Sequence, residues 1–423
     1  MCAFYKLMRG SKSNPHVDPA TFIAHLQELY NPTQDEEFPE VQGCERDPTI
    51  LTSPISKEEI ETVMKTLNSK AIANMGISPR TLKDSAANSP LSIILTSIFN
   101  HMLDTGTFPE LWMKSACIFL FKKGCKSDPN NYRTICIQNA FMKLFGKIMS
   151  ARITKYQEFH KIVPDCQFGF RPNLSTAGAV TILHEVVTEA LSKKQKVFAV
   201  FVDLKKAFDT VHRQLLYNKM LQAGYPRQIA NLIKKQHGSL SMTVRAEGIN
   251  YGDVKSAIGV PQGQPESPGL FNLFTADLPA IFEGQGAVLA GKKVPLIMYA
   301  DDMVLLSNCP FEVQEMLNRL CNYLAENNLQ MNTDKTKLMI FHKGRLPNIA
   351  KRPFHANNVE LEQVKEFVYL GVTMTPQLSY TKHLENINMR ARTKIGIIFA
   401  MAPLQMFSLS WQINCTKLHS TSL

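Results

Sequence analysis

The chain has 423 residues, of which 44% are hydrophobic and 20% charged, so it can bury a sizeable core and does not have a disordered composition. Its formal net charge of +11 favours a polyanionic partner, either nucleic acid or an acidic membrane surface, although an ordinary basic surface explains the charge equally well. The nine cysteines include no CxxC pair, which argues against a zinc module and favours free thiols in a reducing compartment.

Targeting signals are absent from the sequence. No apolar run reaches the length of a membrane span, and MCAFYKLMRGSKSNP lacks the apolar segment of a secretory signal. We therefore expect an intracellular protein of the nucleus or cytoplasm, with no membrane partner.

The first predicted elements are helical. Residues 1–54 are polar and Pro-rich, and we expect a weakly ordered lead-in with a short helix at TFIAHLQELY. Ser56 is a predicted helix N-cap, and Glu59 three residues later completes a capping box. Further helices are predicted at LSIILTSIFNHMLDTG and NAFMKLFGKIMSARITKYQEF, with a strand between them at WMKSACIFLFKKG.

The pattern becomes more regular after residue 165. KVFAVFVDL is apolar throughout, as expected for a strand that is buried on both faces, and it ends at Asp203. PLIMYA and MVLLS flank Asp301 and Asp302 and predict a tight hairpin, while SLSMTVRAEG begins another. The mixture lacks a strict βαβ rhythm and predicts an α+β fold with an antiparallel sheet. The remaining predicted elements are helices at STAGAVTILHEVVTEAL, DTVHRQLLYNKMLQAG, PRQIANLIKKQHG, SPGLFNLFTADLPAIFEG, FEVQEMLNRLCNYLAENNLQ and YTKHLENINMRARTKIGII, and strands at TKLMIFHKG and KEFVYLGVTM.

Three carboxylates suggest a metal site. Asp301 and Asp302 repel each other, and both stay ionised only if a positive charge lies close. If the strand ending at Asp203 lies beside their hairpin, three carboxylates converge, as two-metal phosphoryl or nucleotidyl transfer requires. The alternative is that an acid here only caps the following helix, which we retain as the interpretation of Asp209.

The string AIGVPQGQPESPGLFNLF predicts a rigid turn in which glycines let the backbone approach a ligand. Together, FVDLKKAFDTV, GVPQG–SPGLFN, YADD, NTDKTKLM and FVYLG resemble, in this order, the palm of a reverse transcriptase of the non-LTR, jockey-like retrotransposon type. NNYRTIC and QFGFRPNLSTAGAV resemble finger segments of the same family.

The resemblance implies a right-hand polymerase fold and an RNA-directed DNA polymerase of a retrotransposon. Its implied domains are a lead-in (1–54), fingers (55–195), a palm with interleaved finger elements (196–375), the start of a thumb (376–400) and an atypical tail (401–423). The implied partners are an RNA template, a DNA primer and dNTPs. The implied cofactor is a pair of Mg²⁺ ions, with Mn²⁺ as a substitute.

The resemblance also implies roles for single residues. The metal ligands and catalytic acids are Asp203, Asp301 and Asp302, with Lys335 near the leaving pyrophosphate; the nucleotide-binding residues are Phe208, which rejects a ribose 2′-hydroxyl, Gln262, Tyr299, Arg133 and Arg171. FVYLG matches the primer grip. A surface position for Lys335 and a structural bridge to a buried carboxylate for Arg171 stay open as alternatives. A nucleic-acid channel is further expected from Lys122, Lys123, Arg390, Arg392 and Lys394, where a solvated basic face is the alternative for the last three.

Several positions depart from the family pattern, namely KAIANMGIS, NYRTIC and GQPESPGLFN. They bear on nucleotide affinity more than on the acids. We expect a fragment of a larger polyprotein or a decayed copy, with endonuclease activity supplied from elsewhere. The alternative functions are a decayed or co-opted RNA-binding protein without polymerase activity and an RNA-dependent RNA polymerase, which an aromatic Phe208 argues against.

Overall fold

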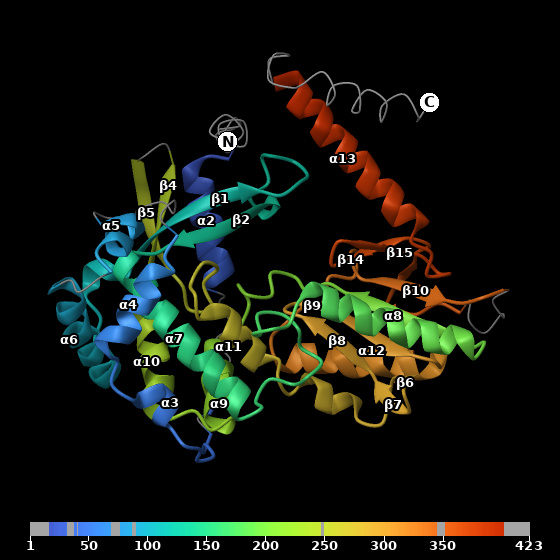
Figure 1. Ribbon diagram of the computed structural model, residues 1–423, viewed down its shortest axis with the longest axis horizontal. Coiled ribbons are helices and arrows are strands. Elements are labelled where there is room, and N and C mark those ends of the chain that lie inside the picture. Colours follow the sequence, from blue (N-terminus) through green and yellow to red (C-terminus); the bar gives the residue numbers. More distant parts are fainter. Residues whose placement is uncertain are drawn as a thin grey trace, which may run out of the picture.

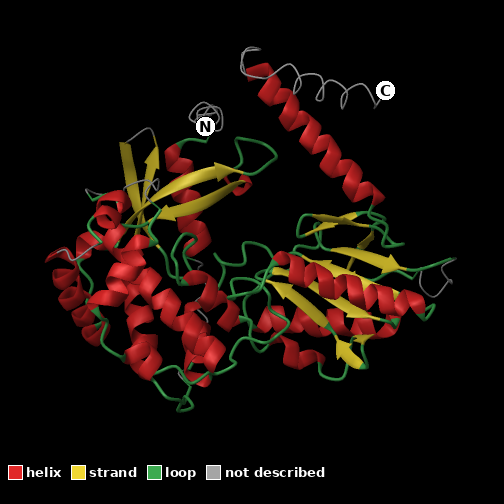
Figure 2. Ribbon diagram, in the orientation of Figure 1, coloured by secondary structure: helices red, strands yellow, loops and turns green. Residues whose placement is uncertain are grey.

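The computed structural model describes residues 17–31, 38–39, 41–68, 77–86, 90–246, 249–344 and 352–401. Helices and strands are mixed along these residues, so the predicted α+β class is confirmed (Figures 1 and 2). The helices are α2 (Pro19–Tyr30), α3 (Thr49–Thr52), α4 (Lys57–Lys65), α5 (Pro79–Asp84), α6 (Pro90–Thr105), α7 (Ala140–Phe159), α8 (Thr176–Ser192), α9 (Arg213–Gln222), α10 (Arg227–Ser239), α11 (Ser267–Phe274), α12 (Pro310–Glu326) and α13 (Thr381–Met401). The strands are β1 (Lys114–Phe121), β2 (Tyr132–Ile137), β3 (Val197–Val202), β4 (Ser241–Ala246), β5 (Ile249–Lys255), β6 (Ala287–Leu289), β7 (Lys292–Val294), β8 (Leu296–Tyr299), β9 (Asp302–Ser307), β10 (Lys337–Phe341), β11 (His355–Ala356), β12 (Val359–Glu360), β13 (Glu362–Gln363), β14 (Phe367–Tyr369) and β15 (Val372–Met374).

A five-stranded sheet has the order β13-β10-β3-β9-β8 and is antiparallel except for the β10–β13 pair. Strand β3 lies at the centre of this sheet and is buried along its whole length, because both of its faces are covered. Its alternate side chains Ala199 and Phe201 pack into a core with α8, while Val200 and Val202 belong to the larger core that includes α12. This two-sided burial explains why KVFAVFV is apolar at every position.

A second sheet has four strands in the order β2-β1-β4-β5. Helix α2 covers it, with Phe22 stacked on Phe119 at a ring distance of 3.8 Å and Leu26 fully buried. The helix predicted at TFIAHLQELY is confirmed by α2. The apolar face of TFIAHLQELY is ordered because the sheet offers a complementary apolar surface, which a local pattern cannot reveal.

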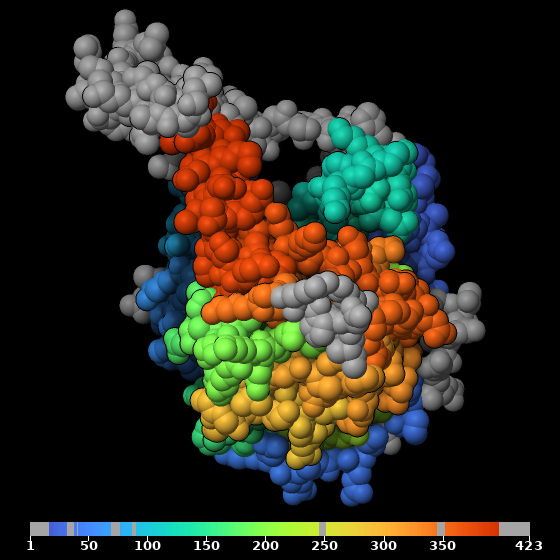
Figure 3. All heavy atoms as spheres, turned by 90° about the vertical axis from the view of Figure 1, so that its right-hand side faces the viewer, coloured from blue at the N-terminus to red at the C-terminus, as the bar shows by residue number. Residues whose placement is uncertain are grey.

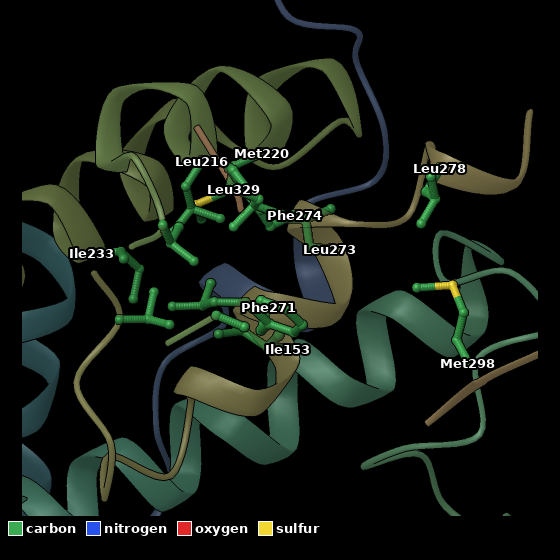
Figure 4. Close-up of a cluster of buried hydrophobic side chains, with 14 of the residues drawn as sticks. Ile153, Leu216, Met220, Ile233, Phe271, Leu273, Phe274, Leu278, Met298 and Leu329 are labelled. Atoms are coloured by element: carbon green, nitrogen blue, oxygen red, sulfur yellow. The ribbon is translucent and has the colours of Figure 1, made fainter. Parts of the chain in front are cut away.

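The helical body consists of α3, α4, α6, α7, α9, α10 and α11 and lies beside the five-stranded sheet in Figure 1. Figure 4 shows its core, in which Phe271 and Phe274 of α11 lie among Leu216 of α9, Ile233 of α10 and Ile153 of α7. All five side chains have exposed fractions of 1% or less. Helix α11 thereby fixes the loop that precedes it, which carries the VPQG string.

The N-terminus of α4 is capped as predicted, since Ser56 accepts a hydrogen bond from the Glu59 amide at 3.1 Å. The Glu59 carboxylate has another partner. Both of its oxygens accept hydrogen bonds from Arg152 of α7, at 2.9 and 2.7 Å. Glu59 thus ties two helices together.

Other predicted bounds differ from the structure. Gly238 lies inside α10 rather than closing it, and the helix predicted at SPGLFNLFTADLPAIFEG ends at Phe274 before a short 3₁₀ turn (Leu278–Phe282). KEFVYLGVTM forms the β14–β15 hairpin rather than one strand. Helix α8 was predicted to belong to the fingers, but it packs on the five-stranded sheet. The predicted boundary between fingers and palm at residue 195 therefore separates two elements that pack together.

Helix α13 extends away from the body next to β15, as Figure 3 shows from the side. Within the described residues, no helix is both long and apolar enough to span a bilayer. The described cysteines are free, as predicted. The prediction for residues 401–423 lies almost wholly outside the described residues.

Candidate active site

Asp203 and Asp302 lie at facing strand ends. Strands β3 and β9 are antiparallel with Val202 opposite Met303, so the same register carried one position further sets Asp203 opposite Asp302. The backbone of Asp203 is held by two bonds, from its NH to Thr336 Oγ1 at 3.2 Å and from the Asn332 NH to its carbonyl at 2.8 Å. The predicted proximity of this strand end and the hairpin is confirmed.

The hairpin that carries Asp301 and Asp302 has a two-residue turn. Tyr299 pairs with Asp302, leaving Ala300 and Asp301 between the strands. Ala300 has a φ of +57°, a conformation that an L-residue adopts at a cost of roughly 1 kcal/mol or more. The surrounding structure must therefore stabilise this turn.

Gln167 supplies that support, and the sequence analysis did not single it out. Its side chain is 1% exposed, and its Oε1 accepts hydrogen bonds from the NH groups of Ala300 at 2.9 Å and Gly169 at 2.8 Å. Its Nε2 donates to the Ala300 carbonyl at 3.3 Å. A Cβ on Gly169 would lie 2.3 Å from the Ala300 nitrogen, so only glycine permits this approach. The string QFGF contained this signal, but nothing local linked it to the acids.

Both acids of the turn, Asp301 and Asp302, have a raised pKa. Burial raises the pKa of Asp301, and the charge of Asp203 adds to this shift. Asp302 reaches solvent at the turn, yet the protein around it desolvates the carboxyl and, with repulsion from Asp301 and Asp203, raises its pKa to about 6. Lys335 offsets part of the negative charge, because its Nζ lies 3.2 Å from Asp203 Oδ2. The site thus carries a surplus of negative charge.

The carboxylate oxygens of Asp203, Asp301 and Asp302 are suitable ligands for a divalent cation. Carboxylate oxygens are the ligands that Mg²⁺ prefers, and the raised pKa values indicate charge that a cation would neutralise. As placed, the described part of the chain contains no group of three acidic, histidine or cysteine side chains that is ready to hold one ion. An ion would therefore have to draw the carboxylates together and compete with Lys335 for Asp203.

A large pocket of about 760 Å³ opens beside the acids and is lined by both Asp203 and Asp301. Lys122 and Arg133 reach it from the β1–β2 hairpin, and Lys335 also lines it. Burial together with the neighbouring Arg133 and Lys335 charges lowers the pKa of Lys122. This concentration of cations beside acids suits a ligand that brings its own negative charge.

Phe208 and Gln262 line the same large pocket. The Phe208 ring stacks on Phe271 of α11 at 4.6 Å and meets the edge of Phe170 at 6.5 Å. Gln262 donates from Nε2 to Asp209 at 3.0 Å. Phe170, which the sequence analysis did not single out, is 52% exposed with a φ of +59°. An exposed aromatic in a strained conformation is a further candidate contact for a nucleotide.

The structure also places Arg171, Tyr299 and Asp209, and the role of Tyr299 stays a prediction. Arg171 makes a bidentate ion pair with Glu158, with both N–O distances at 2.8 Å, and it also donates to the Pro164 carbonyl. The alternative of a structural bridge is therefore the one that the chain forms, although Glu158 is only partly buried. Tyr299 ends β8 opposite Asp302. Asp209 does not cap a helix, because the N-cap of α9 is His212; the interpretation of Asp209 as a cap is wrong.

A smaller pocket of about 510 Å³ borders the acids from the β14 side. Asp203, Asp302 and Lys123 line it together with Tyr369 of the FVYLG string. The Tyr369 hydroxyl is buried and lacks a hydrogen-bond partner among the described residues. Arg390, Arg392 and Lys394 lie exposed on α13. Their contact with nucleic acid stays a prediction.

Two of the departures from the family pattern, GQPESPGLFN and NYRTIC, contribute residues to the large pocket. GQPES places Glu266 wholly inside the protein, where Gln236 donates to it and Gly146 leaves room for its other oxygen. NYRTIC forms β2, while most of KAIANMGIS lies outside the described residues.

Comparison with known proteins decides the family. The family model described as "Reverse transcriptase (RNA-dependent DNA polymerase)" matches residues 121–374. The chain belongs to the reverse transcriptase family. This reverse transcriptase chain is 28% identical, over 86% of its length, to "Probable RNA-directed DNA polymerase from transposon BS" of Drosophila melanogaster. It is 30% identical over 82% of its length to "RNA-directed DNA polymerase from mobile element jockey" of Drosophila funebris.

A more distant relative is "Retrovirus-related Pol polyprotein from type-1 retrotransposable element R2" of Nasonia vitripennis, 26% identical over 76% of this chain and covered over 31% of its own length. The matches cover 41% of the transposon BS protein and 38% of the jockey protein, so the chain spans about two fifths of these relatives. The resemblance to non-LTR retrotransposon reverse transcriptases is confirmed.

Proposed function

We propose that the chain is an RNA-directed DNA polymerase of a non-LTR retrotransposon, which adds dNTPs to a primer 3′-hydroxyl on an RNA template. One observation carries this proposal. Asp203 and the Asp301–Asp302 turn lie at facing strand ends on the rim of a pocket that also holds Lys122 and Arg133. Carboxylates that suit a metal ion and cations that suit phosphate oxygens, in one pocket, match the charges of a metal-bound nucleoside triphosphate.

Asp203, Asp301 and Asp302 would hold two Mg²⁺ ions, which when bound lower the pKa of the attacking hydroxyl and neutralise charge on the triphosphate. The protein's own contribution is to hold the reactants in place. Gln167 fixes the turn that bears two of the acids, and the bonds to Asn332 and Thr336 fix the third. Such fixed geometry supplies much of the rate enhancement in nucleotidyl transfer.

The walls of the large pocket would bind and select the nucleotide. Lys122 and Arg133 would contact the triphosphate, and Lys335, released from Asp203, would donate a proton near the leaving pyrophosphate. Phe208 would exclude a 2′-hydroxyl, since its ring cannot turn freely against Phe271. Arg171 is not assigned to the nucleotide, because its donors serve Glu158 and its own loop.

In this proposal the five-stranded sheet is the palm, and the four-stranded sheet with the helical body forms the fingers. The β14–β15 hairpin would be the primer grip, because β14 lines the smaller pocket together with Asp302. Helix α13 begins the thumb, and its exposed Arg390, Arg392 and Lys394 would follow the nucleic-acid backbone.

The test is incorporation of dTTP on poly(rA)/oligo(dT) with Mg²⁺, with Mn²⁺ and with EDTA. We expect metal-dependent synthesis that falls on the order of 10³-fold in Asp301→Asn and Asp302→Asn. Asp84→Asn, which changes an exposed carboxylate on α5, is the matched control and should keep full activity. Synthesis that persists in the two site variants would refute the proposal.

The same experiment tests the non-enzymatic alternative. A folded chain that binds RNA with a steep salt dependence, yet incorporates no nucleotide with either metal, would be an RNA-binding descendant of the family. The RNA polymerase alternative would be favoured by UTP incorporation equal to that of dTTP.

A further inference from the structure

Asp209 follows Phe208 and is 8% exposed, yet it lines the large pocket. A buried carboxylate is costly unless donors satisfy it. Its two oxygens have different donors from distant parts of the chain. Tyr30 Oη donates to Oδ1 at 2.8 Å, and Gln262 Nε2 donates to Oδ2 at 3.0 Å. Asp209 therefore links helix α2 to the VPQG loop.

The bond to Asp209 sets the orientation of the Gln262 amide. An ionised carboxylate only accepts hydrogen bonds, so the amide nitrogen must face Asp209. The amide oxygen lies on the other branch and is left for a different ligand. The Gln262 carbonyl is fixed as well, because it accepts from the Cys136 NH of β2 at 2.9 Å.

The backbone around Asp209 leaves little freedom for rearrangement. The Val260 NH donates to the Phe208 carbonyl at 2.8 Å, and the Gly259 NH donates to the Val211 carbonyl at 2.7 Å. Gly259 has a φ of +83°, and a Cβ there would lie 2.6 Å from the Asp209 carbonyl oxygen. The segment that carries Asp209 and the loop that carries Gln262 are thus held together as one unit.

Tyr30 comes from outside residues 121–374, the part of the chain that the family model matches. It ends α2, is 4% exposed, and its carbonyl accepts from the Ala257 NH at 2.9 Å and the Ile258 NH at 3.3 Å. Helix α2 is thereby attached at both the backbone and the side chain to the stretch that leads into the VPQG loop. Burial raises the pKa of Asp209, while the hydrogen bond from Tyr30 and the charges of Lys206 and Lys122 counteract that shift.

We propose that Tyr30 and Asp209 are positioning residues for the incoming nucleotide, acting through the amide of Gln262, and that α2 is therefore part of the nucleotide site. This inference rests on the proposed polymerase function. It assigns a role to a helix that precedes the matched segment and to a carboxylate that is not among the three proposed metal ligands. The chemistry needs only the hydrogen bonds already formed.

A purely structural role is the competing explanation, because both side chains are buried. The two roles predict different kinetics. Loss of a positioning contact misplaces Gln262 and raises the KM for dNTP while kcat changes little; a structural defect lowers the fraction of active protein, which lowers kcat at constant KM. Coupling to Gln262 separates them further, since contacts that act through one residue are not additive.

The experiment measures kcat and KM for dTTP on poly(rA)/oligo(dT) for Tyr30→Phe, Asp209→Asn and Gln262→Ala, and for each of the first two combined with Gln262→Ala. Tyr30→Phe removes one hydroxyl and should raise KM about 3- to 10-fold, as expected for the loss of one bond of the network. Asp209→Asn keeps an acceptor for Tyr30 but replaces the other by an NH2 group that cannot accept from Gln262, so the Gln262 amide turns over or loses this bond and KM should rise roughly 10-fold or more. Added to Gln262→Ala, neither should raise KM further by more than about twofold. Tyr251→Phe on β5, an exposed tyrosine, and Asp84→Asn are the matched controls.

Each outcome decides the matter. An unchanged KM in Tyr30→Phe, or full additivity with Gln262→Ala, overturns the inference while the proposed function stands. A wild-type protein that incorporates no nucleotide defeats the proposed function, and the inference falls with it. If Asp209→Asn fails to fold, the Tyr30→Phe pair alone still decides.

Discussion

The five-stranded sheet has an apolar interior, whereas the helical body buries charged side chains. Strand β3 is apolar at every position, and the acids appear only where the strands end. Among the residues that the structure describes, the buried charged or histidine side chains all belong to the helical body or the loops that join it: Arg152, Asp209, Arg213, His237 and Glu266. Each is held by hydrogen bonds to segments far away in the sequence.

The difference shows two ways of placing functional groups. The acids are placed by strand register, which an apolar core determines on its own. The residues proposed to bind the nucleotide are instead held by buried polar side chains, and each of these side chains needs a hydrogen-bond partner. Their contacts should therefore be more sensitive to single changes, to pH and to loss of distant segments.

Arg152→Ala gives the largest expected effect on stability. The guanidinium pairs with Glu59 and donates to the Ser53 carbonyl at 2.6 Å, so its removal leaves a carboxylate and carbonyls without donors. We expect the free energy of unfolding to fall by roughly 3–5 kcal/mol. The exposed Arg80–Asp84 pair provides the control, since Arg80→Ala should cost less than about 1 kcal/mol in the same urea titration. Equal losses for the two variants would contradict the contrast between the regions.

Gln167→Ala tests the side chain that supports the turn between Asp301 and strand β8. The Ala300 turn should relax, and a displacement of about 1 Å at the acids would lower kcat by around 10²-fold. Gln167→Glu keeps the acceptor but loses the donor to the Ala300 carbonyl, and it should fall between wild type and Gln167→Ala. Gln363→Ala on the exposed edge strand β13 is the control. Unaltered kcat in Gln167→Ala would mean that the apolar strands suffice.

Phe208→Ala tests selection at the large pocket. Removing a ring held by Phe271 opens space for a 2′-hydroxyl, so the preference for dTTP over UTP should fall roughly 10- to 100-fold in kcat/KM. Phe311→Ala removes an exposed ring on α12 and should leave the ratio unchanged. A ratio that stays the same in Phe208→Ala would reopen the assignment to an RNA polymerase.

The smallest effect concerns pH. His237 is 1% exposed, and burial, aided by the Arg213 charge, lowers its pKa well below the usual 6.5. Below pH 6.5 the unfolded chain binds a proton at this site that the folded chain does not, so stability present above pH 6.5 is lost as the pH falls, by at most about 1.4 kcal/mol per pH unit.

The measurement is the melting temperature of wild type, His237→Gln and the exposed control His355→Gln between about pH 7.5 and 5.5. The acid-side decline should be shallower in His237→Gln, which carries no titrating group at this position. Parallel declines in all three proteins would show that His237 does not contribute.

Most elements, and the acids, could be predicted because they depend on local patterns. Ser56 was recognisable from the capping box, and Asp301 and Asp302 from two apolar runs with a short gap. The errors concern side chains whose partners lie far away. Asp209 stands where a helix cap is common, but Tyr30 and Gln262 engage it instead, and Arg171 is engaged by Glu158.

By itself, the sequence determined where the carboxylates lie along the chain and that the strands behind them are buried, because burial on both faces requires an apolar residue at every position of such a strand. The order of the motifs determined the family. Only the tertiary structure decided that Gln167 supports the Ala300 turn and that α2 reaches the VPQG loop through Tyr30. A hydrogen bond between distant residues requires only that one donor and one acceptor come close in the folded chain. Such a single pair produces no repeating pattern in the sequence.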